Sequence, residues 1–315
     1  MKKKEVRIGN IAIGGDNCVA LQSMTNTDTA DVYATSAQLA ALRAAGCDIA
    51  RLAVACADIG FAKVRYNPGN TSAAGLKELV AACKANGCPV RIGINGGSLE
   101  KDIKAKYGGA TAQALAESAM RSVAALEREN FHDIVVSVKS SDVRICVDAY
   151  RELDKVCAYP LHIGVTESGG GEDAVIKSTA GIASLLLDGI GDTVRVSLTG
   201  DPVREIEVGR SILHAVGLDD DYVEVVSCPT CARCFYDLES LAARCSEMTR
   251  GVRKRLKVAV MGCVVNGPGE ASDADIGIAG GKDKAVLFSG GRITETLPVA
   301  EAENKFLAML GDLLR

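Results

Sequence analysis

Residues 89–98 read PVRIGINGGS, and this stretch indicates the fold of the larger part of the chain. Its first six residues form a short apolar run rich in Val and Ile, as in a buried strand. A polar turn that carries glycine follows at once, and Ala-rich stretches with helical period lie on either side. The same succession recurs along the chain, which is typical of βα units around a parallel sheet.

Seven strand candidates follow this pattern, and six helical stretches lie between or after them. Polar residues follow the strand candidates, so they gather at the carboxyl ends of the strands, where barrels of this type keep their chemistry. The chain therefore predicts a TIM-like (β/α) barrel. The expected strands are Val19–Met24, Asp48–Val54, Val64–Tyr66, Pro89–Ile94, Asp133–Val138, Leu161–Thr166 and Thr193–Leu198; the expected helices are Thr35–Ala45, Ala73–Asn86, Thr111–Arg128, Asp142–Val156, Asp173–Leu187 and Pro202–Val216.

One join in this barrel is too short. Only the residues from Ala55 to Lys63 separate two of the strand candidates, whereas a crossover between parallel strands needs about a dozen residues or more. The barrel is therefore expected to lack about one βα unit near 55–63. A barrel that lacks one unit must close with fewer strands or leave an edge open.

The pattern changes at the three acids Asp219–Asp221, which we interpret as a linker. The barrel is then residues 1–218, and residues 222–315 form a smaller α/β domain of ordinary size. Its expected elements are a helix from Asp237 to about Arg255, strands at Lys257–Met261, Ile276–Ala279 and Val286–Ser289, and a last helix from Pro298.

Composition excludes several classes of protein. The net charge of −4 predicts no bulk attraction to nucleic acid or to an anionic membrane. No run approaches the roughly 18 apolar residues that span a bilayer, and the first residues have no apolar signal-peptide core. We therefore expect a cytoplasmic protein. Its 12 cysteines, in a reducing compartment, point to metal binding or redox chemistry more than to disulfides.

The strongest chemical signal is Cys228-Pro229-Thr230-Cys231, followed by Cys263 and Glu270 on a glycine-rich stretch. Three thiolates suit an iron–sulfur cluster or zinc, and a carboxylate would leave one iron exchangeable by substrate. Structural zinc sites tend to use four Cys or to include His, and this domain has no His. Cys234 continues the spacing and competes as a ligand, although a helix is expected to begin just after it.

A second signal is a series of five cations at strand ends. Interior barrel positions are normally apolar, so cations on five strands that face one mouth suggest a polyanionic ligand such as a diphosphate. Internal ion pairs with Asp or Glu are the alternative for any single one of them. The five are Arg51, Arg65, Arg91, Lys139 and Arg195.

Other titratable residues give weaker signals. Glu167 follows a strand candidate and could act as an acid or base, or simply pair with a cation. His132, His162 and His214 are too scattered to form a metal site. His162 lies within a strand candidate and could reach the barrel mouth, but we interpret it as a core histidine with satisfied hydrogen bonds.

Several stretches together resemble the bacterial 4-hydroxy-3-methylbut-2-enyl diphosphate synthases of the non-mevalonate isoprenoid pathway. They follow one another in order over nearly the whole chain. They are Gln22–Thr27, Arg65–Asn70, Arg91–Asp102, Val136–Asp142, Leu161–Gly170, Gly189–Leu198, Cys228–Arg233 and Gly262–Glu270.

The resemblance implies a barrel joined to a sulfite-reductase-like domain with a [4Fe–4S] cluster, held here by Cys228, Cys231, Cys263 and Glu270. It also implies reductive ring opening and dehydration of 2-C-methyl-D-erythritol 2,4-cyclodiphosphate, with electrons from flavodoxin or ferredoxin, in a homodimer with a shared site. Glu167 would be the acid/base residue, and Asn266 would lie beside the cluster. The diphosphate ligands would be Arg51, Arg65, Arg91, Asn95, Lys139, Arg195 and Ser197.

Two departures from the family pattern leave other functions open. Cys234 stands where the family has a polar residue. The short join keeps Ala57-Asp58-Ile59 of a family segment but has Gly60 where the family has His, so Asp58 is the residue carried over. An iron–sulfur paralogue impaired in catalysis is therefore one alternative. A non-redox barrel enzyme similar to dihydropteroate synthases, with zinc at its cysteines, is another.

Overall fold

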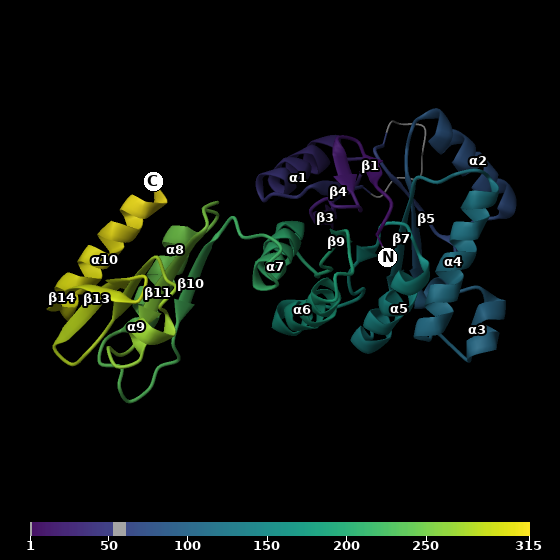
Figure 1. The fold of residues 1–315 in the computed structure, drawn as a ribbon. Coiled ribbons are helices and arrows are strands. Elements are labelled where there is room, and N and C mark those ends of the chain that lie inside the picture. Colours follow the sequence, from purple (N-terminus) through teal and green to yellow (C-terminus); the bar gives the residue numbers. More distant parts are fainter. Residues whose placement is uncertain (1, 53–60) are drawn as a thin grey trace. The chain divides into compact units, whose positions relative to one another are not determined.

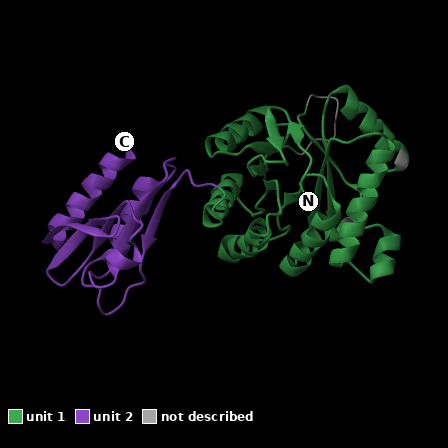
Figure 2. Ribbon diagram, viewed as in Figure 1, with its two compact units in different colours: residues 1–218 green, residues 219–315 purple. Residues whose placement is uncertain are grey.

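The computed structural model describes residues 2–52 and 61–315. The chain divides into two compact units, residues 1–218 and residues 219–315 (Figure 2). Each unit has its own hydrophobic core, and we describe each by itself.

In its described residues, the first unit is built on seven parallel strands with helices outside them (Figure 1). One run of strands has the order β4-β3-β9-β8 and the other the order β5-β6-β7; a bridge between Val136 and Leu161 joins β7 to the β8 side. The strands are β3 (Ala20–Met24), β4 (Ile49–Arg51), β5 (Val64–Tyr66), β6 (Val90–Asn95), β7 (Ile134–Lys139), β8 (His162–Ile163) and β9 (Thr193–Val194).

Helices begin where a polar side chain can cap them. Asp31, Thr111, Asp142 and Asp201 each accept a hydrogen bond from a backbone N–H in the first turn of the helix that follows. The helices are α1 (Val32–Ala44), α2 (Ala73–Ala85), α3 (Lys101–Tyr107), α4 (Ala112–Arg128), α5 (Val143–Val156), α6 (Gly171–Leu187) and α7 (Pro202–Ala215), with short 3₁₀ turns at Pro68–Asn70 and Gly96–Ser98.

The barrel is open between β4 and β5. In the part of the chain that the structure describes, each of these strands pairs with only one neighbour, β4 with β3 and β5 with β6. The opening lies at the short join, where a missing unit was expected. Most of that join, with Cys56 and Asp58, lies outside the described residues.

A small antiparallel hairpin, β1 (Val6–Ile8) and β2 (Ile11–Ile13), precedes the barrel strands. Its apolar side chains form a buried cluster with Ala20, Ile49 and Val135, which lie at the first residues of β3 and β4 and near the start of β7. The hairpin therefore covers the amino-terminal ends of these strands. Sequence periodicity did not predict it, because two three-residue strands are too short to show alternation.

The second unit is a five-stranded sheet in the order β10-β11-β12-β13-β14, parallel over the first three strands and antiparallel over the rest. Alternate residues of β11 face opposite cores, Val258 and Val260 toward α8 and α10, Ala259 and Met261 toward the segment of α9. The elements are β10 (Val223–Ser227), α8 (Leu238–Thr249), β11 (Leu256–Met261), α9 (Gly267–Glu270), β12 (Ile276–Ala279), β13 (Lys284–Ser289), β14 (Arg292–Pro298) and α10 (Val299–Leu314).

Several expected boundaries were wrong, including that of the strand expected over Asp48–Val54, because β4 ends at Arg51. The helix expected to reach Arg255 ends at Thr249, and Gly251 then takes a left-handed φ of 74° that a helix cannot continue through. Strands β8 and β9 are shorter than expected; after Ile163 the chain passes through Gly164 with a φ of 154°, and the ladder ends there. None of the described helices is long and apolar enough to cross a membrane.

Candidate functional site

One small cavity in the first unit brings together the residues expected to hold a diphosphate. It has a volume of about 90 Å³, and the residues around it come from each of the described parallel strands, β3 to β9, or from the turns that follow them. All seven expected ligands line it: Arg51, Arg65, Arg91, Asn95, Lys139, Arg195 and Ser197.

Strand register explains how residues distant in sequence meet here. Arg65 of β5 stands opposite Arg91 of β6, and Asn95 of β6 stands opposite Lys139 of β7. Arg51 is the last residue of β4. Because parallel strands in a barrel share one carboxyl end, Arg51, Asn95 and Lys139 converge on one mouth. Arg65 and Arg91 lie earlier along their strands and line the same cavity.

The cations of this cavity repel one another. Burial, with Arg65 and Arg195 adding repulsion, lowers the pKa of Arg51; burial, with Arg51 and Arg65 nearby, also lowers the pKa of Arg91. Burial beside Arg91 and Arg195 holds the pKa of Lys139 well below its usual range. A guanidinium stays protonated nonetheless, so the cavity concentrates positive charge and favours a multiply charged anion.

Two glycines in the strands make room for these long side chains. A Cβ on Gly93 of β6 would lie 2.5 Å from Arg65 Nε, and a Cβ on Gly164 would lie 2.8 Å from Lys139 Nζ. Both distances are too short for real contacts. The absence of a side chain at these positions lets cations cross the inside of the barrel.

Sequence reasoning missed four residues of this region. Lys63 Nζ donates to Gln22 Oε1 over 2.9 Å, and Gln22 lines the cavity. Glu205, on α7, pairs with Arg195 over 3.1 Å. The cysteine and cation spacings gave no signal for Lys63 or Glu205; Gln22 stood only within the family resemblance.

His162 is the fourth, and its expected role was partly wrong. Its ring is fully buried and Nδ1 lies 2.7 Å from Thr193 Oγ1, but Nε2 has no hydrogen-bond partner among the described residues. The residue lines the cavity, and burial together with Lys139 and Arg91 holds its pKa well below the usual value. His162 is therefore a neutral ring beneath the cations.

Glu167 stands beside this cavity in sequence but is not among its described lining residues; its neighbour Thr166 is. Glu167 has a φ of 54°, a left-handed conformation that is uncommon outside glycine. The turn that holds it is therefore sterically constrained.

A larger cavity of about 520 Å³ lies at the opening of the barrel. Residues of both bordering strands line it, Arg51 and Leu52 on one side and Lys63, Val64 and Arg65 on the other. It shares Gln22, Arg51, Arg65 and Arg91 with the smaller cavity.

The cysteines of the second unit lie on two neighbouring loops. Cys228 follows β10, Cys263 follows β11, and these strands are paired in parallel. Gly262 N donates to Cys228 Sγ over 3.1 Å, and a Cβ on Gly262 would lie 3.3 Å from the sulfurs of both Cys228 and Cys234. Cys234 is therefore close to the predicted ligand Cys228.

Arg233 connects the remaining ligand candidates. Its hydrogen bonds lower the pKa of the Cys231 thiol, and the acidic groups of Cys263 and Glu270 add to the rise in its own pKa. Asn266 Nδ2 donates to Glu270 Oε1 over 3.3 Å. The four predicted ligands and Asn266 therefore belong to one neighbourhood on the second unit.

We tested whether these residues fit a cluster. Among the described residues, no three Cys, His, Asp or Glu side chains converge on a single-ion site, and no described cysteine is in a disulfide. A four-iron cluster binds each ligand through a different iron, so its ligands need not meet at one point. Three thiolates on adjacent glycine-bearing loops, without a side chain at Gly262, fit such a group.

Comparison with known proteins supports the family resemblance. The model described as GcpE TIM-barrel domain matches residues 3–58 and 51–210, and the model described as GcpE protein C-terminal domain matches residues 224–312. The two barrel matches meet at the short join.

Curated relatives match nearly the full length. Proteins named 4-hydroxy-3-methylbut-2-en-1-yl diphosphate synthase (flavodoxin) are 49% identical in Caldanaerobacter subterraneus subsp. tengcongensis, over 92% of this chain and 91% of the relative, and 44% identical in Geobacter sulfurreducens, over 99% and 98%. These alignments run over 323 and 346 positions, more than the 315 residues of the chain, so both relatives have residues with no counterpart here. The chain therefore belongs to the GcpE family, the family of the diphosphate synthases that it resembles.

Proposed function

We propose that this chain converts 2-C-methyl-D-erythritol 2,4-cyclodiphosphate into (E)-4-hydroxy-3-methylbut-2-enyl diphosphate. The reaction consumes two electrons and two protons, opens the cyclic diphosphate and releases water. The observation that carries the proposal is the single cavity lined by Arg51, Arg65, Arg91, Asn95, Lys139, Arg195 and Ser197. One guanidinium group can donate two parallel hydrogen bonds to two oxygens of a phosphate, so several guanidinium groups in one cavity suit a ligand with two linked phosphates.

We assign the [4Fe–4S] cluster to Cys228, Cys231, Cys263 and Glu270. When bound, the cluster would supply electrons to the substrate, and the carboxylate ligand is the weakest donor to iron beside three thiolates. The lowered pKa of Cys231 favours the thiolate that iron requires.

The protein's own groups would then bind the anion and manage protons. The cations neutralise the negative charge of the diphosphate. As the ring opens, one of its two ester bonds to carbon breaks, and the other keeps the diphosphate attached to the carbon skeleton. Glu167 is proposed to donate a proton to the hydroxyl that departs as water, and Asn266 to lie at the cluster beside Glu270. Flavodoxin is the proposed electron donor, and a cytoplasmic homodimer with a shared site is the proposed assembly.

The test is a turnover assay on anaerobically purified full-length protein. Brown protein with four irons by Mössbauer spectroscopy, forming the linear diphosphate with reduced flavodoxin, is the expected result. Zero product from a fully loaded cluster would instead support the impaired paralogue. Colourless protein with stoichiometric zinc would overturn the assignment of the cluster.

The ligand assignment predicts a specific loss. Cys263→Ser should abolish the visible absorption and at least about 99% of turnover, because a serine hydroxyl is a poor ligand for iron–sulfur clusters. Cys18→Ser, at an exposed cysteine of the first unit, is the matched control and should keep both. A four-iron spectrum that survives Cys263→Ser would contradict the assignment.

A further inference from the structure

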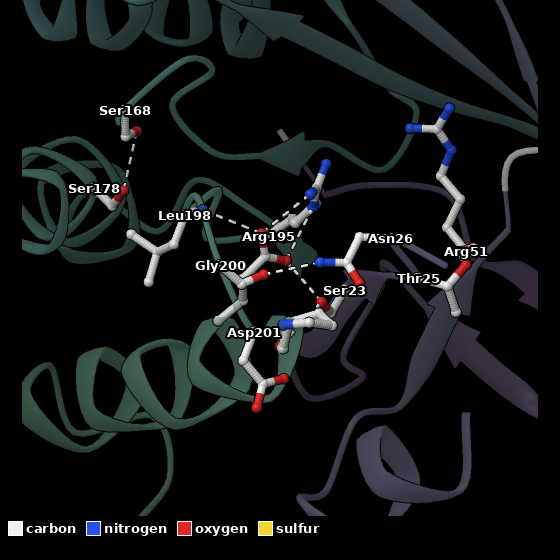
Figure 3. Close-up of polar contacts among 12 residues, drawn as sticks. Ser23, Thr25, Asn26, Arg51, Ser168, Ser178, Arg195, Leu198, Gly200 and Asp201 are labelled. Atoms are coloured by element: carbon white, nitrogen blue, oxygen red, sulfur yellow. Dashed lines mark hydrogen bonds and ion pairs between the residues drawn. The ribbon is translucent and has the colours of Figure 1, made fainter. Parts of the chain in front are cut away.

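A buried carboxylate lies behind the cationic cavity. Glu205 is on α7 and is only 3% exposed. It accepts four hydrogen bonds: from Ser23 Oγ at 2.6 Å, from Arg195 Nε at 3.3 Å and Nη2 at 3.1 Å, and from Leu198 N at 3.1 Å. Figure 3 shows the contacts around Arg195, Ser23 and Leu198, of which Ser23 lies on β3 and the other two in the segment after β9.

This geometry fixes the orientation of Arg195. The carboxylate takes Nε and one Nη2 hydrogen, side by side in a fork. Both hydrogens of Nη1 and the second of Nη2 are left for a ligand, and Arg195 lines the cavity. The guanidinium thus presents one defined edge to an anion.

Glu205 also holds the backbone beside Ser197, another lining residue. Its Oε1 accepts from Leu198 N, the peptide N–H that directly follows Ser197. One carboxylate therefore places two of the expected diphosphate contacts, the side chain of Arg195 and the turn that carries Ser197. Ser23 in turn anchors the carboxylate to β3.

Among the described residues, the other arginines of the cavity and Lys139 have no carboxylate in an ion pair. A buried ion pair is no more stable on average than well-packed apolar side chains, so stability alone gives no reason for this one. A carboxylate in a cavity for an anion also weakens the field that attracts the anion. Its presence at one arginine therefore calls for a geometric role.

We propose that Glu205 is a positioning residue that orients Arg195 and the Ser197–Leu198 turn for binding of a diphosphate. The inference rests on the proposed function for the identity of the substrate, but the geometry requires only a diphosphate group. A role in orienting Arg195 and a purely electrostatic role predict opposite effects on the affinity for an anion when the Glu205 carboxylate is neutralised. Loss of negative charge alone would tighten binding of an anion, whereas loss of orientation would weaken it.

The experiment is a double-mutant cycle on the full chain, with Glu205→Gln, Arg195→Met and both together. Calorimetry would measure the affinity for inorganic diphosphate and for the cyclodiphosphate. We expect Glu205→Gln to weaken binding about 10- to 100-fold in the native background, the range of coupling for groups in one buried network, and less than about 2-fold when Arg195 is Met. Turnover should show the same change mainly in KM.

Two control variants distinguish a loss of orientation at Arg195 from a loss of folded protein. Glu207→Gln, on the exposed face of the same helix and paired with Arg204, should bind as the native chain does. Glu205→Asp keeps the charge but shortens the side chain, so it should also weaken binding; it is read alone if Glu205→Gln does not fold.

Three results would overturn the inference: tighter or unchanged binding by Glu205→Gln, equal losses with and without Arg195, or native affinity in Glu205→Asp. A native chain that binds inorganic diphosphate but not the cyclodiphosphate would contradict the proposed function instead. In that case the double-mutant cycle is still measured with inorganic diphosphate, and its result tests the role of Glu205 independently of the proposed function.

Discussion

Lys63, which bonds to a lining residue of the cavity, has a pKa that burial moves close to neutrality. Burial, with Arg91 and Arg51 adding repulsion, lowers its pKa to about 7. A diphosphate beside these cations would raise that pKa again, because an anion stabilises the ammonium form. Binding near neutral pH should therefore take up a proton at Lys63.

We predict that the affinity of the native chain for inorganic diphosphate falls as pH rises from about 7 to 9, over and above the change caused by titration of the ligand. Lys63→Met removes the titrating group, so its affinity should be about 10-fold weaker at pH 7 and should follow the ligand alone. Calorimetry in buffers of different ionisation enthalpy measures the proton uptake. Equal uptake by the native chain and by Lys63→Met would refute this assignment.

The same residue predicts a pH dependence of stability. Its folded pKa lies below the unfolded value, so between about pH 7 and 10.5 the unfolded chain binds more protons at this position. The contribution of Lys63 to the free energy of unfolding consequently rises with pH in that window, and below pH 7 its full cost remains.

For single residues, positions at strand ends could be predicted from the sequence, whereas contacts between residues far apart in the sequence could not. Arg51 and Lys139 are the last residues of their strands, so their convergence follows from the fold class. Arg91 is the second residue of β6, and its place in the cavity does not follow from a position at a strand end. Glu205 lies in the first turn of α7 and bonds to residues 10 and 182 positions away. No local pattern carries such a pairing.

At the scale of elements, strand β6 carries the cation Arg91 and also Gly93, which leaves space for the side chain of Arg65. Gly93 leaves room for Arg65, whose Nε a Cβ would approach within 2.5 Å. Since the obstructed atom belongs to a flexible side chain, Gly93→Ala should fold normally while Arg65 moves out of place.

We predict that Gly93→Ala weakens the binding of inorganic diphosphate about 10-fold, the effect of losing one charged hydrogen bond, with a melting temperature within a few degrees of the native value. Gly97→Ala, where a Cβ meets only Asn95 Oδ1 at 3.8 Å, is the matched control. Native affinity in Gly93→Ala, measured by calorimetry, would show that Arg65 does not reach the ligand.

The accuracy of the predicted limits did not depend on the length of the element. The short strands β5 and β12 have the expected limits, and helix α5, which an aspartate caps, differs from expectation by one residue. Hairpin β1–β2, helices α3 and α9 and strands β10 and β14 were not among the expected elements. The hairpin strands have three residues each, and most of β14 is exposed or half-buried, so it shows little of a core pattern.

For the whole molecule, the open wall between β4 and β5 is the main departure from a complete barrel. In the described residues these two strands lack a partner on one side, and unpaired edges cost hydrogen bonds and packing. The curated relatives have additional residues in their alignments with this chain.

We predict that inserting, between Arg51 and Val64, the segment at the corresponding place in the Caldanaerobacter relative raises the stability of the first unit. A gain of about 1–3 kcal/mol would correspond to a rise of roughly 2–10 °C in the melting temperature. A Gly/Ser segment of equal length is the control and should give no rise. Calorimetric melting of both insertions decides, and equal melting temperatures would mean that the wall is already complete.

The β1–β2 hairpin, residues 6–13, contacts strands on both sides of the barrel opening. Their apolar side chains contact the base of β4, the strand at one border of the opening, and also Val135 of β7, which belongs to the run that ends at the other border. They thus join the two halves of an incomplete ring from beneath. Terminal segments usually fray independently of the domain they precede; here, release of this hairpin would free both halves at once, so it should melt together with the ring itself.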